Sequence, residues 1–130
     1  MIIEARGIQA YQQVQTQSRS PLELVVMLYD GALTNLAQAR AADACGDVRQ
    51  RGAAISKTLA IVGALQETLD LDGGGTVAAE LDRLYDYVTR RLLDVTVKRD
   101  AGAIDEIRKL LTGVRDAWTQ IAAAPQALSS

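Results

Sequence analysis

Apolar side chains return at alternating steps of three and four residues along most of this chain, the spacing of one face of an α-helix. The clearest helix start is at Ser20, followed by Pro21 at the first helical position and by Glu23 three residues after the cap. Two overlapping apolar stripes then cover the same stretch, so we expect a central helix that touches more than one neighbour. The stripes are Leu22, Val25, Tyr29, Ala32, Leu36 and Ala39, and Leu22, Val26, Tyr29, Leu33 and Leu36.

The same spacing predicts four helices, separated by short turns that make sequential neighbours antiparallel. Their expected bounds are about 21–44, 48–69, 76–97 and 103–123. Gly46 is a natural residue after a helix end, Asp47 and Thr76 are candidate N-caps, and Pro125 ends the last helix. The predicted fold is all-α, an antiparallel up-down-up-down four-helix bundle over residues 20–124 with a short N-terminal helical arm, 1–19, and a flexible tail, 125–130.

The N-terminal arm differs in character from the bundle helices. It is rich in glutamine and carries Ile8, Tyr11 and Val14 at three-residue steps, which gives it one narrow apolar edge. A helix this short is not stable alone in water. We therefore expect the arm to be partly mobile and to dock on another apolar surface.

Several apolar side chains lie beside the main stripes, and two interpretations of them remain open. They are Ile61, Leu65, Leu84 and Leu93. Such surplus apolar width forms either a groove for a partner helix or ordinary core in a five-segment packing with the arm. Tyr29, Leu81, Val88 and Trp118 occupy the stripes themselves, and we interpret them as core packing.

Length and charge narrow the class of protein. A chain of 130 residues has the size of one domain, and although 48% of its residues are apolar, no run approaches the roughly 18 needed to span a bilayer. A net charge of −2 with both signs mixed argues against nucleic-acid binding. Cys45 is the single cysteine and the N-terminus has no signal-peptide pattern, so we expect a cytoplasmic protein without intrachain disulfides.

The absence of histidine removes the commonest general base, metal ligand and phosphorelay residue. A ferritin-like metal carboxylate site and a histidine phosphotransfer bundle are therefore excluded. The carboxylates Asp70, Asp72 and Glu80 do not have the offsets of a calcium loop, and no Gly-Lys-Ser/Thr follows the glycines 73–75. We expect no enzyme, no metal site and no cofactor.

Five segments together carry a more specific pattern. They are 7–14 (GIQAYQQV), 21–33 (PLELVVMLYDGAL), 84–88 (LYDYV), 90–93 (RRLL), and the pair 110–111 and 115–118 (LL and RDAW). In this order the segments resemble the flagellin-specific secretion chaperones, the FliS family. The resemblance covers about residues 6 to 120.

The resemblance implies a cytoplasmic chaperone that binds the disordered C-terminal region of flagellin, prevents its premature polymerisation and delivers it to the flagellar type III export gate protein. It favours the groove interpretation, with a flagellin groove formed by Ile61, Leu65, Leu84, Tyr85 and Leu93.

The arm also acquires a role from this resemblance. In the free protein it covers apolar surface that flagellin takes over, and Ile8 and Tyr11, with Val14 beside them, are the arm residues linked to docking on the export gate. The free protein is expected to be a monomer or a weak homodimer. The alternative is a self-associating structural or adaptor bundle without a flagellin client.

Overall fold

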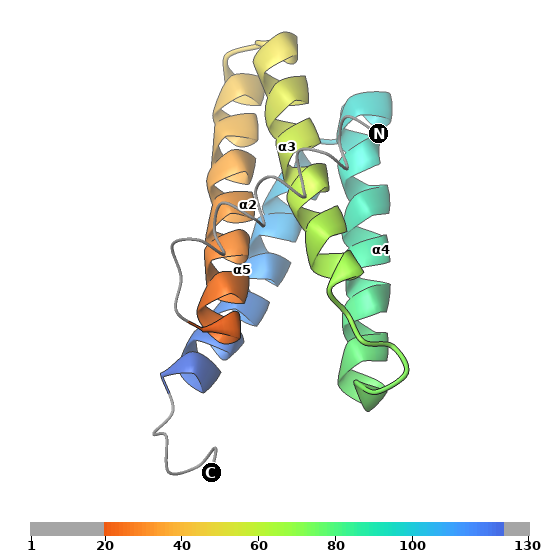
Figure 1. Cartoon of the computed structure of the whole chain (residues 1–130). Coiled ribbons are helices and arrows are strands. Elements are labelled where there is room, and N and C mark those ends of the chain that lie inside the picture. Colours follow the sequence, from red (N-terminus) through yellow and green to blue (C-terminus); the bar gives the residue numbers. More distant parts are fainter. Residues whose placement is uncertain (1–19, 124–130) are drawn as a thin grey trace.

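Four antiparallel helices make up residues 20–123, the part of the chain that the computed structural model describes (Figure 1). They are α2 (Pro21–Ala44), α3 (Val48–Glu67), α4 (Gly75–Lys98) and α5 (Gly102–Ala122). This confirms the predicted all-α bundle. The expected arm, 1–19 with Ile8, Tyr11 and Val14, and the expected tail, 125–130, lie outside the described residues.

The first two helices begin where the polar capping residues predict. The Ser20 hydroxyl accepts a hydrogen bond from the backbone N–H of Glu23 at 3.1 Å. The Asp47 carboxylate accepts one from the backbone N–H of Gln50 at 3.0 Å. Between these helices Gly46 has a φ of 72°, the left-handed conformation expected of the residue after a helix end.

The start of α4 differs from the sequence prediction. Gly74 is the N-cap and makes no side-chain capping bond, so the assignment of Thr76 as the cap was wrong. The Gly74 N–H donates to the carbonyl oxygen of Asp70 at 2.6 Å, and a Cβ on Gly74 would lie 2.5 Å from that oxygen. Gly75 follows with a φ of 62°. Close backbone approach, which only glycine allows, sets this helix start.

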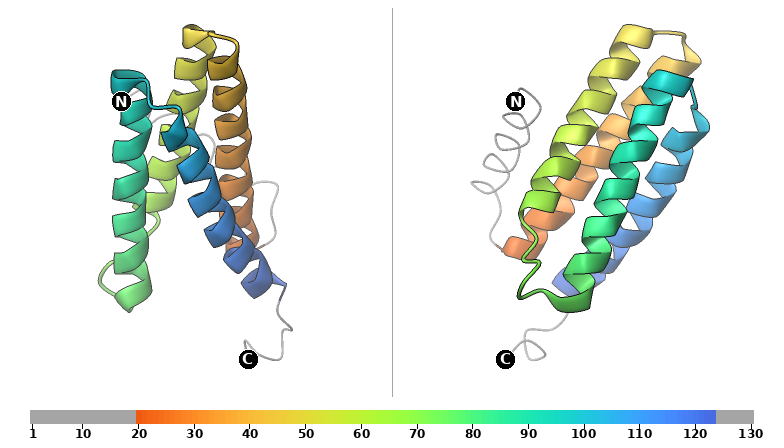
Figure 2. Two further views of the ribbon diagram at one scale, coloured as in Figure 1. Left: turned by 180° about the vertical axis from the view of Figure 1, so that it is seen from behind. Right: turned by 90° about the vertical axis from the view of Figure 1, so that its right-hand side faces the viewer.

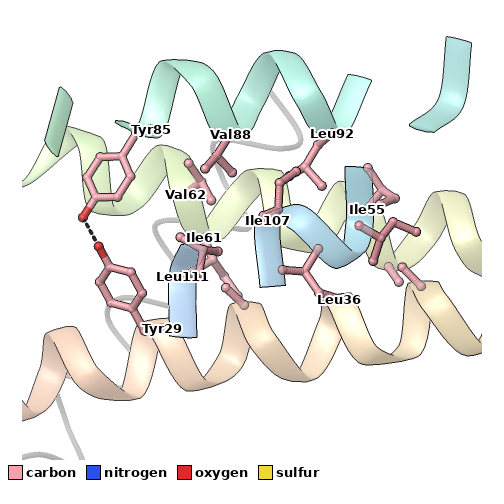
Figure 3. Packing of buried hydrophobic residues seen from close by; sticks show 14 of the residues in the cluster. Tyr29, Leu36, Ile55, Ile61, Val62, Tyr85, Val88, Leu92, Ile107 and Leu111 are labelled. Carbon is pink, nitrogen blue, oxygen red and sulfur yellow. Dashed lines mark hydrogen bonds between the residues drawn. The ribbon is translucent and has the colours of Figure 1, made fainter. Parts of the chain in front are cut away.

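The core lies where α2 packs against α3 and α5, with α4 closing the bundle on the other side of α3 and α5 (Figures 1 and 2). Its largest fully buried side chains come from all four helices (Figure 3). They are Tyr29, Tyr85, Leu28, Leu36, Leu65, Leu92, Ile104, Ile107, Leu111, Val62, Val88 and Val95. The central position predicted for the first helix is confirmed, although the stripes did not include Leu24 and Leu28, which are also buried.

Helix α3 buries a wider face than a single apolar stripe. Ile55 and Val62, seven residues apart on one stripe, are buried, and Ile61 and Leu65 beside that stripe are buried too, whereas Val48 at the helix start is 62% exposed. The core side of α3 also carries Thr58, whose hydroxyl donates back to the carbonyl of Ala54 at 2.9 Å and so needs no other partner. Its buried face therefore includes both the stripe and the apolar side chains beside it.

Two ion pairs join α2 to α5, and α2 contributes the acidic residue to one pair and the basic residue to the other. Arg115 of α5 contacts Asp30 of α2 with 2.7 Å between Nε and Oδ1. Arg40 of α2 contacts Asp105 of α5 with 3.2 Å between Nε and Oδ1. These charges lie on partly exposed side chains, so each pair contributes no more than about 1 kcal/mol.

Arg91 is the centre of a denser polar network where α4 turns into α5. Its guanidinium contacts Glu106 at 2.8 Å, Asp94 at 3.0 Å and Asp100 at 3.1 Å. The Tyr87 hydroxyl also donates to Glu106. These hydrogen bonds, first from Tyr87 and then from Arg91, lower the pKa of the Glu106 carboxyl. The network fixes the α4–α5 turn at this end of the bundle.

Candidate binding cleft

Apolar side chains become more exposed towards one end of the bundle. At this end α2 and α4 begin and α3 and α5 end (Figure 1). Along α5, Leu111 is fully buried, Trp118 is half-buried and Ile121 is 53% exposed. Along α4 the same change runs backwards, from buried Tyr85 to Val77 at 61% exposure. Apolar side chains at this end are therefore available to a partner.

A cleft of about 250 Å³ opens here, and all four helices contribute to its wall. Its lining is mainly apolar and consists of Val25, Leu65, Thr68, Leu69, Asp70, Gly74, Val77, Ala78, Leu81, Tyr85 and Trp118. We call it the end cleft. It is smaller than the roughly 300–1,000 Å³ of sites that hold small molecules. Its size and lining suit apolar side chains of a protein partner.

Two tyrosine hydroxyls meet beside the end cleft. The Oη atoms of Tyr29 and Tyr85 are 2.6 Å apart, and both rings are buried (Figure 3). Burial raises the pKa of Tyr29 and of Tyr85, which keeps both hydroxyls neutral at physiological pH. These two tyrosines therefore meet as a pair of neutral hydroxyls.

Trp118 completes this polar group from α5. Its Nε1 atom is buried and has no hydrogen-bond partner of ordinary geometry within residues 20–123. The indole N–H nevertheless lies near enough to the Tyr29 hydroxyl to oppose slightly the rise in that group's pKa. A buried donor without a partner lowers the stability of the fold at this point.

The five residues predicted to form a flagellin groove do not form one continuous surface. Leu65 and Tyr85 line the end cleft, although both are almost fully buried. Ile61 is in the core, and Leu84 is half-buried against it. Leu93 is 49% exposed and lies towards the other end of α4. Ile61 packs against α2, where its Cδ1 atom would lie 3.4 Å from a Cβ placed on Gly31.

Sequence reasoning missed Val25, Leu69 and Val77 as lining residues. All three are apolar residues near the start or end of a helix, where fewer neighbouring helices can bury them. That position could have identified them as lining residues from the sequence. Exposed Leu71, in the loop between α3 and α4, belongs to the same pattern.

Other kinds of site find no support among residues 20–123. That part of the chain contains no group of His, Cys, Asp and Glu side chains able to hold a metal ion. None of its helices combines the length and hydropathy needed to cross a membrane. Cys45 is exposed and lies at the end of α2, away from the cleft.

Comparison with known proteins gives a consistent match. The family model described as flagellar protein FliS matches residues 4–125. The chain is 43% identical over 122 residues to the flagellar secretion chaperone FliS of Salmonella typhimurium, covering 90% of each chain. It is 37% identical to flagellar secretion chaperone FliSB of Pseudomonas aeruginosa, covering 89% of this chain and 95% of that one. It is 33% identical to FliS of Bacillus subtilis, covering 85% and 82% respectively.

Proposed function

The chain belongs to the FliS family of flagellar secretion chaperones, and we propose that its client is the C-terminal segment of flagellin, which it binds in the cytoplasm and delivers to the export gate protein. As a secretion chaperone it is a binding protein and not an enzyme. Binding the client segment would keep flagellin from polymerising before export.

The end cleft is the observation that supports a helical client. A disordered segment that folds on binding gains most from apolar pockets into which single side chains insert. The cleft supplies such a pocket, and Leu71, Val77 and Ile121 extend apolar surface around it. We propose that the client inserts an apolar side chain there, next to Leu65 and Tyr85.

The N-terminal arm is part of the same proposal. Ile8, Tyr11 and Val14 lie outside the described residues, and we propose that they cover client-binding surface in the free protein and contact the export gate when flagellin displaces them. The tether to Ser20 keeps the arm at high local concentration, but its few apolar side chains limit its attraction. A flagellin segment that buries more surface would therefore displace it. Ile61, Leu84 and Leu93 do not line the end cleft, so any contact they make with the client would lie outside it.

The first test is complex formation in solution. Size-exclusion chromatography with light scattering should give a 1:1 complex with flagellin, and no complex with flagellin that lacks its last ~40 residues, a typical length for a segment that folds on binding. A homodimer that flagellin does not change would instead support the structural-bundle alternative.

A matched pair of variants tests the location. Val77→Asp places a charge at the end cleft, and Val97→Asp places the same charge on α4 at a residue that is 77% exposed and outside it. Both side chains are exposed enough to leave the helical circular dichroism signal intact. Flagellin affinity should fall at least about tenfold in Val77→Asp only, since a buried carboxylate lacks a partner. Equal affinities would place the client elsewhere.

A further inference from the structure

Negative charge gathers on the elements that form the end cleft. From Thr58 to Asp82 the chain has five carboxylates and no lysine or arginine. The carboxylates are Glu67, Asp70, Asp72, Glu80 and Asp82. This stretch runs from the second half of α3 through the loop into the first turns of α4, and it supplies most of the cleft lining. Asp70 lines the cleft itself, and the other four lie within two residues of lining residues along the chain; we call these five residues the acidic rim.

Few cations offset this charge: the exposed Arg83 of α4 directly follows the stretch, and α5 contributes one arginine near the cleft. Arg115 of α5 lies one turn before Trp118, but its guanidinium already contacts Asp30 at 2.7 Å and Asp116 at 3.5 Å. Asp82 accepts a hydrogen bond from the Gln66 amide, which is uncharged. Glu67, Asp72 and Glu80 are exposed. The whole chain has a net charge of only −2, so the negative charge at this end is local.

We propose that the end cleft selects a helical segment in which an apolar anchor is flanked by lysine or arginine. This inference rests on the proposed flagellin client and adds the chemistry by which that client is recognised. The apolar anchor supplies affinity through burial, whereas the acidic rim supplies orientation and a faster association rate. A segment with acidic flanking residues is rejected because like charges meet at the rim.

Trp118 makes occupancy of the cleft directly measurable. It is the single tryptophan of the chain and lines the cleft, so its emission reports on what enters there. The probe is a synthetic peptide with the C-terminal sequence of flagellin, without tryptophan, titrated into the full chain. Calorimetry on the same samples measures total binding. Trp118 emission should shift with the calorimetric binding curve.

Salt and charge variants then test the acidic rim. The triple variant Glu67→Gln, Asp72→Asn, Glu80→Gln removes three exposed negative charges. The matched control Gln38→Lys, Gln50→Lys, Thr96→Lys changes net charge equally at exposed positions away from the cleft. At about 0.1 M salt the rim variant should bind about three- to thirtyfold more weakly than the parent chain, and the control should not. Raising salt to about 1 M, where the Debye length falls to ~3 Å, should remove that difference.

Each failure has a separate meaning. Calorimetric binding that leaves Trp118 emission unchanged overturns the cleft as the anchor site. An equal affinity for the parent and rim variants, or an equal loss in the control, overturns recognition by the rim while flagellin remains the client. No binding of the peptide or of whole flagellin by the parent chain overturns the proposed function itself. Emission that changes with the concentration of the chain alone assigns the cleft to a second copy and overturns the inference.

Discussion

The hydrogen bond between Tyr29 and Tyr85 allows a quantitative test of the core beside the cleft. It joins α2 to α4 across the bundle, with 2.6 Å between the two oxygens. Replacing either tyrosine by phenylalanine removes one hydroxyl and changes the shape of the core very little. The other hydroxyl stays buried, at a residue that is 0% or 2% exposed. Each single variant therefore loses a bond and leaves a buried polar group without its partner.

Each single variant should lower the free energy of unfolding. In Tyr29→Phe the Tyr85 hydroxyl has no other partner among residues 20–123, so we expect a loss of about 1–3 kcal/mol. In Tyr85→Phe the Tyr29 hydroxyl in turn loses its one hydrogen bond to a described residue, and a similar loss of about 1–3 kcal/mol is expected. The double variant leaves neither hydroxyl behind. Its loss should be smaller than the sum of the single losses by about 1 kcal/mol or more.

Urea unfolding followed by far-UV circular dichroism measures these values. The slope of free energy against urea should stay constant, which shows that only stability has changed. Tyr87→Phe is the matched control, because Tyr87 lies on the same helix and donates to Glu106 rather than to Tyr29. Its combination with Tyr29→Phe should be additive within about 0.5 kcal/mol. If Tyr29→Phe and Tyr85→Phe are also additive, the two hydroxyls do not share a hydrogen bond and the reasoning fails.

Three further predictions concern the core, the α4–α5 turn and the arm. Leu111→Ala should lower the free energy of unfolding by about 2–5 kcal/mol, and Leu110→Ala, at a 37% exposed neighbour, by far less; similar urea midpoints would contradict the burial of α5. The folded protein holds the pKa of Glu106 below its ordinary 4.5, so this carboxylate stabilises the fold above that pH and the contribution is lost as pH falls through the folded pKa. Glu106→Gln should therefore flatten the fall in urea midpoint between about pH 5 and pH 3, and an unchanged slope would contradict the network. Deleting residues 1–17 should leave the helical signal intact and keep or raise flagellin affinity; unchanged or greater hydrogen-exchange protection of residues 8–14 on adding flagellin would contradict the arm as a competitor.

The helix starts that a side chain determines could be predicted from the sequence. Ser20 and Asp47 cap α2 and α3 because each offers an oxygen to a backbone N–H three residues later. The start of α4 could not, since it depends on the Gly74 N–H reaching the carbonyl of Asp70. Thr76 has the right side chain for a cap, but the chain has already entered the helix at Gly75.

The client surface was harder to predict for a geometric reason. A stripe shows which side chains share a helix face, but not which neighbour covers each part of it. Leu111, Trp118 and Ile121 follow one another along α5 at steps of seven and three residues, yet Leu111 is buried while Ile121 is 53% exposed, because the helices cover each other less at this end. Ile61 illustrates the opposite case, a side chain beside the main stripe that the position of α2 makes part of the core.

The ion pairs between α2 and α5 help to set how these two helices align along each other, although each pair contributes little energy. Sliding α5 along α2 by one turn, about 5.4 Å, would separate Asp30 from Arg115 and Arg40 from Asp105 at the same time. Reversing α5 end for end would set Asp105 towards Asp30 and Arg115 towards Arg40, so that like charges face each other. The charges therefore distinguish one alignment of this helix pair from its competitors, even though they add little to the strength with which the helices hold.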